Sequence, residues 1–258
     1  MRRLAGGLVI AAALLACASA AKAESLIAAL SSDKVKIESN FTGTEIVVFG
    51  EIARDAATVA RAEPYDLAII VTGPPQRTTV RRKGRFLGLW VNRDAEDYRQ
   101  VPGFYAAHLT RPSVDMATRP VLEKLQIGLH NVNLPIVGKS NVPFSDRDDF
   151  RDAFLRLRIQ NALYAERIHS IEFLSQNLFR TTIPLPSNVP VGEYKVTTYL
   201  LRGGALLAAQ EQNLTIAKTG FEQLTFSLAH RYAPIYGAAA VMLALLTGWL
   251  AGVVFRKD

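Results

Sequence analysis

The sequence predicts a mainly β protein: an immunoglobulin-like β-sandwich with a helical insertion, followed by a single C-terminal transmembrane helix. Short β-branched segments separated by Gly and Pro turn signals recur through residues 24–218, and one stretch at about 145–165 has the 3.6-residue spacing of a helix. Residues 233–255 hold no charged side chain. At about 1.5 Å per residue they would form a helix of roughly 35 Å, which is long enough to cross a bilayer core.

Residues 1–23 have the three parts of a secretory signal peptide. Two arginines precede a short apolar block, 4–16, and residues 21–23 (Ala-Lys-Ala) match a small-x-small cleavage site. The predicted mature chain therefore begins at Glu24. Cys17 leaves an alternative open, because the sequence Leu-Leu-Ala-Cys resembles a bacterial lipobox, in which the cysteine is lipidated.

The two ends of the chain predict its domain organisation and location. A cleaved signal exports the domain 24–218, and a juxtamembrane segment, 219–232, links this domain to the transmembrane helix 233–255. Residues 256–258 form a cytoplasmic tail whose two cations agree with the positive-inside rule. We expect a single-pass protein of the inner membrane, with a periplasmic N-terminal domain and a cytoplasmic C-terminus.

The charge and cysteine content exclude several classes of protein. The formal net charge is +7, but five of the 30 basic residues and one of the 23 acidic ones lie in 1–23 and 256–258, which leaves 25 against 22 in between. This balance gives no reason to expect a nucleic-acid partner. Because Cys17 is the only cysteine, a chain that begins at Glu24 has no disulfide, no thiol nucleophile and no cysteine-ligated metal.

The first half of the exported domain contains alternating and β-branched segments typical of strands. Residues 78–91 predict a β-hairpin with its turn at Lys83-Gly84. Further strands are predicted at 34–38, 45–50, 65–71 and 101–109.

The helical insertion is expected to begin at an N-cap formed by Ser145, with acidic residues in the first turn. Two apolar stripes follow at helical spacing, so the helix is expected to be covered on both sides. Arg147, Arg151 and Arg158 lie between the stripes. They predict a solvated charged edge, and the alternative is contact with an anion or a partner.

The second β group consists of predicted strands at 179–185, 194–201 and 205–216, with a tight turn at residues 202–204. Tyr194 begins the middle strand, shortly after Pro190. A tyrosine in this position resembles the tyrosine corner of immunoglobulin-like sandwiches. The alternative is an ordinary interfacial tyrosine.

Several short sequences stand out along the chain: RRKGR at 81–85, GLWVN at 88–92, VPGFY at 101–105, LPSNVPVGEY at 185–194, YG at 236–237 and GW at 248–249. They are similar to sequences of a family of predicted transmembrane proteins of alphaproteobacteria. The resemblance covers nearly the whole mature chain, and it implies an inner-membrane protein with a periplasmic domain. The family carries no assigned function, so the resemblance supplies no catalytic residue.

Two groups of residues are candidate contact sites. The first is the basic part of the predicted hairpin, where five cations within nine residues precede a tryptophan. This group predicts contact with an anion, with lipid headgroups or with an acidic partner. The alternative is a soluble hairpin tip. The second is a row of small residues every four positions along the transmembrane helix, which would allow a second helix to approach closely. The residues are Arg77, Arg81, Arg82, Lys83, Arg85 and Trp90 in the hairpin, and Ala240, Ala244, Gly248 and Gly252 in the helix.

No motif for catalysis, cofactor binding or metal binding is found. The four histidines, His108, His130, His169 and His230, form no HxxxH or HExxH pair, and no Gly-rich phosphate loop follows a strand. We therefore expect a non-enzymatic, membrane-anchored periplasmic interaction module without a cofactor. Its expected contacts are the lipid bilayer and, through the transmembrane helix, another membrane protein or a second copy of the chain. It would be accessory to a polytopic envelope protein such as a transporter. The alternative is a periplasmic anion-binding receptor or enzyme that uses the basic hairpin 77–90.

Overall fold

The computed structural model describes residues 24–38, 41–53, 64–137, 142–218 and 233–254. The predicted mainly β class is confirmed, because strands dominate the described residues from Ser25 to Lys218. The predicted signal peptide 1–23, the juxtamembrane segment 219–232 and the tail 256–258 lie outside the described residues.

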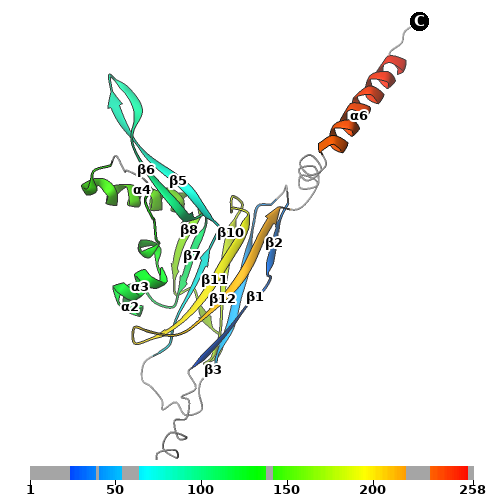
Figure 1. Ribbon diagram of the computed structural model, residues 1–258. Helices are drawn as coiled ribbons and strands as arrows, with labels where there is room; N and C mark the ends of the chain where they lie inside the picture. Colours follow the sequence, from blue (N-terminus) through cyan, green and yellow to red (C-terminus); the bar gives the residue numbers. More distant parts are fainter. Residues whose placement is uncertain (1–23, 39–40, 54–63, 138–141, 219–232, 255–258) are drawn as a thin grey trace, which may run out of the picture.

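The first sheet has four antiparallel strands in the order β1-β3-β10-β9 (Figure 1). Its strands alternate between buried and exposed side chains, as a sheet with one buried face requires. In β10, for example, Phe179, Ile183 and Leu185 are buried. The strands are β1 (Ser25–Leu30), β3 (Gly43–Ala53), β9 (Glu172–Phe173) and β10 (Leu178–Pro186).

The second sheet has six strands in the order β2-β12-β11-β4-β7-β8. The pairs β2–β12 and β7–β8 are parallel, and the other pairs are antiparallel. The central strand β4 is buried along nearly its whole length, on both of its faces, which explains its uninterrupted apolar sequence. The strands are β2 (Lys34–Ile37), β4 (Asp66–Thr72), β7 (Tyr105–Leu109), β8 (Tyr164–Ile168), β11 (Gly192–Arg202) and β12 (Ala205–Lys218).

The two sheets share one hydrophobic core. Val48 and Ile52 of the first sheet belong to the same buried cluster as Leu67, Leu200 and Leu214 of the second. Burial of such side chains stabilises the fold by about 1.5–3 kcal/mol each before the conformational entropy cost is counted. Since a chain that begins at Glu24 contains no cysteine, this core is the main source of stability for the domain.

A long two-stranded arm projects from one end of the sheets (Figure 1). It consists of β5 (Pro75–Phe86) and β6 (Leu89–Pro102). The predicted hairpin is present, but its predicted turn at Lys83-Gly84 is wrong. Lys83 and Gly84 pair with the opposite strand, and the turn is formed by Leu87 and Gly88, which have φ values of 48° and 84°. The aliphatic part of Arg93 occupies the space beside Gly84.

The predicted helical insertion is correct in type but too long. The helix α4 (Arg147–Gln160) follows a 3-10 turn, η2 (Phe144–Asp146), so the N-cap is Asp146 and not Ser145. The end predicted at residue 165 is wrong because Tyr164 begins β8, where it pairs with Tyr105 of β7. Pairing with the sheet therefore replaces helix in the last part of this segment.

Three further short helices were not expected from the sequence. They are α2 (Ser113–Met116), α3 (Arg119–Leu125) and the 3-10 helix η1 (Leu129–Asn131), which lie between β7 and α4 in the chain. The helices α2 and α3 have no side-chain capping bond at their N-terminus. Tertiary contacts therefore hold these elements in place, because isolated helices of this length are unstable in water.

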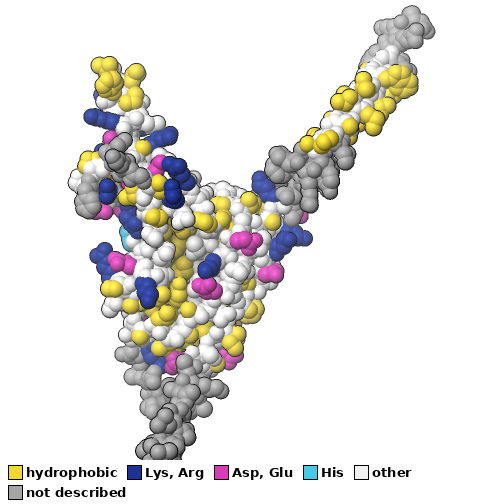
Figure 2. Space-filling model, viewed as in Figure 1, with side chains coloured by type: hydrophobic (Ala, Val, Ile, Leu, Met, Phe, Trp, Pro, Cys, Tyr) yellow, Lys and Arg dark blue, Asp and Glu magenta, His cyan; other side chains and the backbone are white. Residues whose placement is uncertain are grey.

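The C-terminal segment contains the helix α6 (Ala233–Val254), which has 22 residues. A helix was predicted over 233–255, and residue 255 lies outside the described residues. Large apolar side chains of α6, among them Met242, Leu245 and Trp249, are exposed (Figure 2). Within the described residues, no helix is both long enough and apolar enough to cross a membrane.

Candidate functional site: the basic arm and a polar cleft

The lower half of the arm holds part of the predicted basic cluster in ion pairs. Arg77 Nη2 lies 2.5 Å from Asp97 Oδ2, and Arg82 contacts Asp94 at 2.8 Å and Asp146 at 3.0 Å. Hydrogen bonds from Thr79 and then Arg77 lower the pKa of the Asp97 carboxyl. These two arginines therefore fasten the arm to itself and to the start of α4, and their charges are balanced.

The helix α4 braces the root of the arm from one side. Arg158 Nη2 donates a hydrogen bond to Thr78 Oγ1 at 2.8 Å, and its guanidinium lies 5.2 Å from the centre of the Phe154 ring. Burial lowers the pKa of Arg158. Arg151 donates to the carbonyl oxygens of His130 and Val132. The predicted solvated edge is wrong for Arg151 and Arg158, because other parts of the chain fold over this side of α4.

The outer half of the arm has a different character. Lys83, Arg85 and Trp90 are exposed, and Arg85 lies opposite Trp90 in the strand register. Among the described residues, no ion pair is recorded for Lys83 or Arg85. Figure 2 shows hydrophobic side chains gathered at the end of the arm, with Lys and Arg side chains below them. The structure therefore divides the predicted site into a paired lower part and an exposed upper part.

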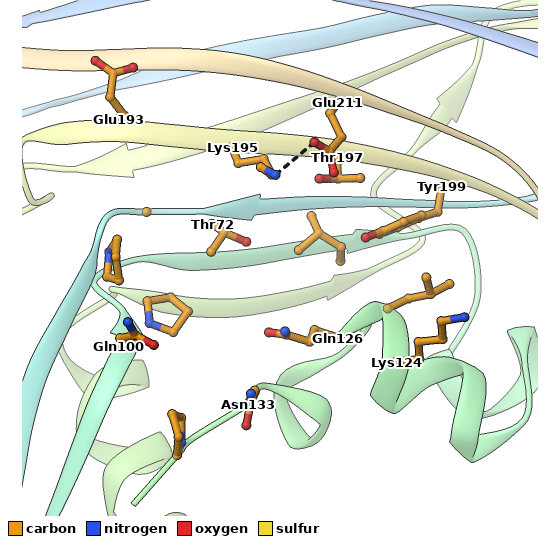
Figure 3. A pocket seen from close by; sticks show the side chains of 16 residues that line it. Thr72, Gln100, Lys124, Gln126, Asn133, Glu193, Lys195, Thr197, Tyr199 and Glu211 are labelled. Atoms are coloured by element: carbon orange, nitrogen blue, oxygen red, sulfur yellow. Dashed lines mark hydrogen bonds and ion pairs between the residues drawn. The ribbon is translucent and has the colours of Figure 1, made fainter. Parts of the chain in front are cut away.

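A cleft of about 500 Å³ lies on the outer face of the second sheet, near the root of the arm. One wall comes from β4, β11 and β12, and the other from the end of α3 and the segment that follows it (Figure 3). The polar side chains that line it are Thr72, Gln100, Lys124, Gln126, Asn133, Glu193, Lys195, Thr197, Tyr199 and Glu211.

Tyr105 of β7 fixes the outer wall of this cleft. Its hydroxyl donates to the carbonyl oxygen of Gln126 at 2.7 Å and accepts from the Gly128 backbone N–H at 3.0 Å. Burial raises the pKa of the Tyr105 hydroxyl, which therefore stays protonated and able to donate. Gln126 and Gln100, which both line the cleft, have φ values of 53° and 55°. Non-glycine residues in this region are uncommon and cluster at functional sites.

The cleft is polar but close to neutral. It contains two lysines and two glutamates, and Lys195 Nζ lies 2.9 Å from Glu211 Oε2 (Figure 3). Glu193 accepts a hydrogen bond from Thr215. In the described parts of the chain, no group of three or more His, Cys, Asp or Glu residues is placed to hold a metal ion. The remaining carboxamides and hydroxyls can exchange hydrogen bonds with a polar ligand.

The cleft could not be predicted from the sequence, because its residues come from six separate parts of the chain. One signal was present. Glu193, Lys195 and Thr197 alternate with the core residues of β11, so that strand has a consistently polar outer face.

The predicted helix-packing residues all lie within α6, where they recur every four residues. They are Ala240, Ala244, Gly248 and Gly252. Apart from the neighbouring residues and backbone of α6 itself, no atom of the described residues lies within 4 Å of a side-chain carbon placed at Gly248 or Gly252. A contact with a second helix through these residues stays a prediction.

Comparison with known proteins gives one match. The family model described as "Putative transmembrane protein (Alph_Pro_TM)" matches residues 25–257. No curated protein and no solved structure shows significant similarity to the chain. The match covers nearly the whole sequence and agrees with the resemblance noted from its short sequences. The chain belongs to the Alph_Pro_TM family.

Proposed function

We propose that this protein is a non-enzymatic interaction module, held at the inner membrane by the segment 233–255, with the domain 24–218 in the periplasm. It acts as an accessory to a polytopic envelope protein such as a transporter. The observation that carries the proposal is the open cleft beside Tyr199, whose lining is rich in carboxamides and hydroxyls and nearly neutral in charge.

An extended polypeptide segment is the ligand that suits this cleft. The carboxamides of Gln100, Gln126 and Asn133 offer the same donors and acceptors as the peptide group. Each hydrogen bond to a peptide contributes about 1 kcal/mol, so several are needed for measurable affinity. A loop of a membrane protein can supply them from its main chain.

The membrane anchor is supported by the sequence and by the family. Residues 233–255 contain no charged side chain, and the family description names a transmembrane protein. The exposed leucines of α6, including Leu245 and Leu246, are suited to contact with lipid.

We also propose that the domain is immunoglobulin-like. The order β1-β3-β10-β9 corresponds to strands A-B-E-D, and β12-β11-β4 corresponds to G-F-C, with β7 and β8 added beside C as in variable-type domains. Tyr194, at the start of β11, donates to the carbonyl oxygen of Pro190 at 2.5 Å, as a tyrosine corner does. The parallel pairing of β8 departs from that pattern.

The alternative of an anion receptor or enzyme built on the basic hairpin is less well supported. The pocket between the arm and α4 contains Arg81, Arg82 and Arg156, but it also contains Asp149 and Asp152. Charges of both signs in one pocket weaken the attraction for an anion.

A site-specific crosslink tests the proposed contact. Benzoylphenylalanine in place of Tyr199 lies in the cleft, whereas the same residue in place of Asn213 is exposed on β12 outside it. We expect irradiation of intact cells to join the Tyr199 variant to a polytopic inner-membrane protein, with little product from the Asn213 variant. Equal products from both positions, or none from Tyr199, would refute the proposed use of the cleft.

The proposed topology has its own test. Protease added to spheroplasts should degrade residues 24–231 and leave only the membrane segment. A fully protected domain would show that the topology is wrong. Sequencing of the mature N-terminus should give Glu24, whereas an acyl group on Cys17 would establish the lipoprotein alternative.

A further inference from the structure

The end of the arm exposes an unusual amount of apolar surface. Phe86, Leu87, Leu89 and Trp90 are 65%, 88%, 70% and 68% exposed, and only Gly88 separates them in the sequence. Single exposed apolar residues are common on soluble domains, but a contiguous group at the end of a projecting hairpin indicates a contact surface.

Leu87, the first residue of the turn, is not the type of residue that the backbone geometry of the turn favours. Positive φ values at Leu87 and Gly88 are those of a type I′ turn, for which Asn-Gly or Asp-Gly is strongly preferred. Leucine is disfavoured in this conformation, and its side chain makes no compensating buried contact because it is 88% exposed. Leu87 therefore weakens the turn, and an apolar contact outside the domain would explain its presence.

The charged side chains next to this apolar end are all positive. From Lys83 to Arg93 the chain holds three cations and no acidic residue. The strand register places Lys83, Arg85 and Trp90 on one face of the arm, and Phe86 and Leu89 on the other. Tryptophan and cations beside an apolar tip are the combination found at the interface between lipid headgroups and acyl chains.

The arm leaves the domain at the end from which the chain continues to α6. The strands β4 and β12 are both antiparallel to β11, and Lys195 of β11 pairs with Thr72 of one and Asn213 of the other. Thr72, before the arm, and Lys218, before the segment 219–232, therefore lie at the same end of the sheet. The twelve residues of β5 extend about 40 Å. A chain of fourteen residues, the length of the segment 219–232, can span at most about 50 Å. The tip of the arm and the start of α6 can therefore reach the same membrane surface.

We propose that the arm tip, residues 86–90, inserts into the interfacial region of the bilayer that holds α6, with Lys83 and Arg85 against anionic lipid headgroups. This inference rests on the membrane anchor of the proposed function. The arm then gives the domain a second attachment, which fixes its orientation above the membrane and holds the cleft at a constant height for a membrane-bound partner.

Fluorescence of the full chain in lipid vesicles tests the inference. The protein has two tryptophans, so Trp249→Phe leaves Trp90 as the only tryptophan, which can be excited selectively over the tyrosines. In vesicles of phosphatidylcholine and phosphatidylglycerol, we expect blue-shifted emission from Trp90 and strong quenching by lipids brominated on their acyl chains. The matched control is Ile27→Trp with both native tryptophans replaced by Phe. Ile27 is 63% exposed and lies near the start of β1. Glu24, just before β1, contacts Tyr65, which lies at the opposite end of β4 from Thr72 and the arm.

Two variants separate insertion from folding. Leu87→Asn supplies the residue that the type I′ turn prefers, so the domain should unfold at an equal or higher temperature while quenching of Trp90 decreases. Combined Lys83→Ala and Arg85→Ala should reduce the inserted population roughly fivefold per cation in vesicles that contain phosphatidylglycerol, but not in phosphatidylcholine alone.

The possible failures are distinguishable by flotation. A protein that floats with the vesicles while Trp90 is quenched no more than the Ile27→Trp control would overturn the insertion, and would assign the tip to a protein partner. A protein that does not float with the vesicles would overturn the anchor of the proposed function, and the insertion with it.

Discussion

The Arg158 guanidinium of α4 donates a hydrogen bond to the Thr78 hydroxyl of the arm at 2.8 Å, across 80 residues of sequence. The same guanidinium lies over the rings of Phe154 and Tyr164, at 5.2 and 5.9 Å from their centres. One side chain therefore joins the arm, the helical insertion and the edge of the second sheet, which explains how a thin two-stranded arm keeps a defined direction.

Replacement of Arg158 by alanine should loosen the root of the arm. The substitution removes the hydrogen bond that the charged guanidinium donates to the Thr78 hydroxyl. We therefore expect the free energy of unfolding to fall by about 2 kcal/mol. Amide exchange near Thr78 should also accelerate. Arg156→Ala, an exposed change on the same helix, is the control. Equal effects of the two changes would show that Arg158 has no bracing role.

Replacement of Tyr194 by phenylalanine should destabilise the domain by about 1–2 kcal/mol. The ring would keep its packing against Phe104, whose centre is 5.9 Å away, and only the bond to the Pro190 carbonyl would be lost. Denaturant unfolding of the domain 24–218 measures this difference. An unchanged midpoint would mean that the corner bond contributes nothing to stability.

The sequence predicts those parts of the fold that local patterns determine. The strands β10, β11 and β12 were predicted to within a few residues, because polar and apolar side chains alternate and glycines or prolines mark their ends. The turn of the arm was placed wrongly because Lys83-Gly84 has a turn-like composition, whereas the pairing of Arg85 with Trp90 moves the turn to Leu87-Gly88. Local turn preference is weaker than the register of a long hairpin.

The candidate sites were predictable only in part, for the same reason. The cations of the arm are adjacent in sequence, so their grouping was visible, but their pairing was not. Asp146, which neutralises Arg82, is 64 residues away. The cleft was invisible because Thr72, Gln126 and Tyr199 meet only once the sheet has formed and Tyr105 has fixed the end of α3. Long-range contacts of this kind leave no periodic signal in a single sequence.

The small-residue stripe of α6 gives a prediction that depends on the membrane anchor. If this face packs against a second helix, Gly248→Leu or Ala244→Leu should abolish crosslinking to the partner in native membranes, because close backbone approach would be blocked. Leu245→Ala, on a different face, should leave it intact. Equal association of all three variants would reduce α6 to a simple anchor, provided that their abundance in the membrane is the same.

His108 gives a pH dependence whose sign follows from its surroundings. It is buried between the sheets, where burial and then the charge of Arg167 lower its pKa to about 4, from a usual value of about 6.5. The Thr181 hydroxyl donates to the Ser170 carbonyl, so we infer that His108 Nδ1–H donates to Thr181 Oγ1 at 3.0 Å. The lowered pKa describes a neutral imidazole in the folded protein, and the hydrogen bond places its proton on Nδ1.

Stability should therefore decrease as the pH falls from about 6.5 to about 4. In this interval the unfolded chain binds a proton at His108 and the folded protein does not, so protonation favours unfolding. The loss approaches about 3 kcal/mol at the acidic end, and it is absent above pH 7. The measurement is the free energy of unfolding against pH for wild type, His108→Gln and the exposed-site control His169→Gln. The His108→Gln profile should be flatter than the wild-type profile by this amount, whereas the His169→Gln profile should run parallel to the wild-type profile. Parallel profiles for all three proteins would refute the role of His108.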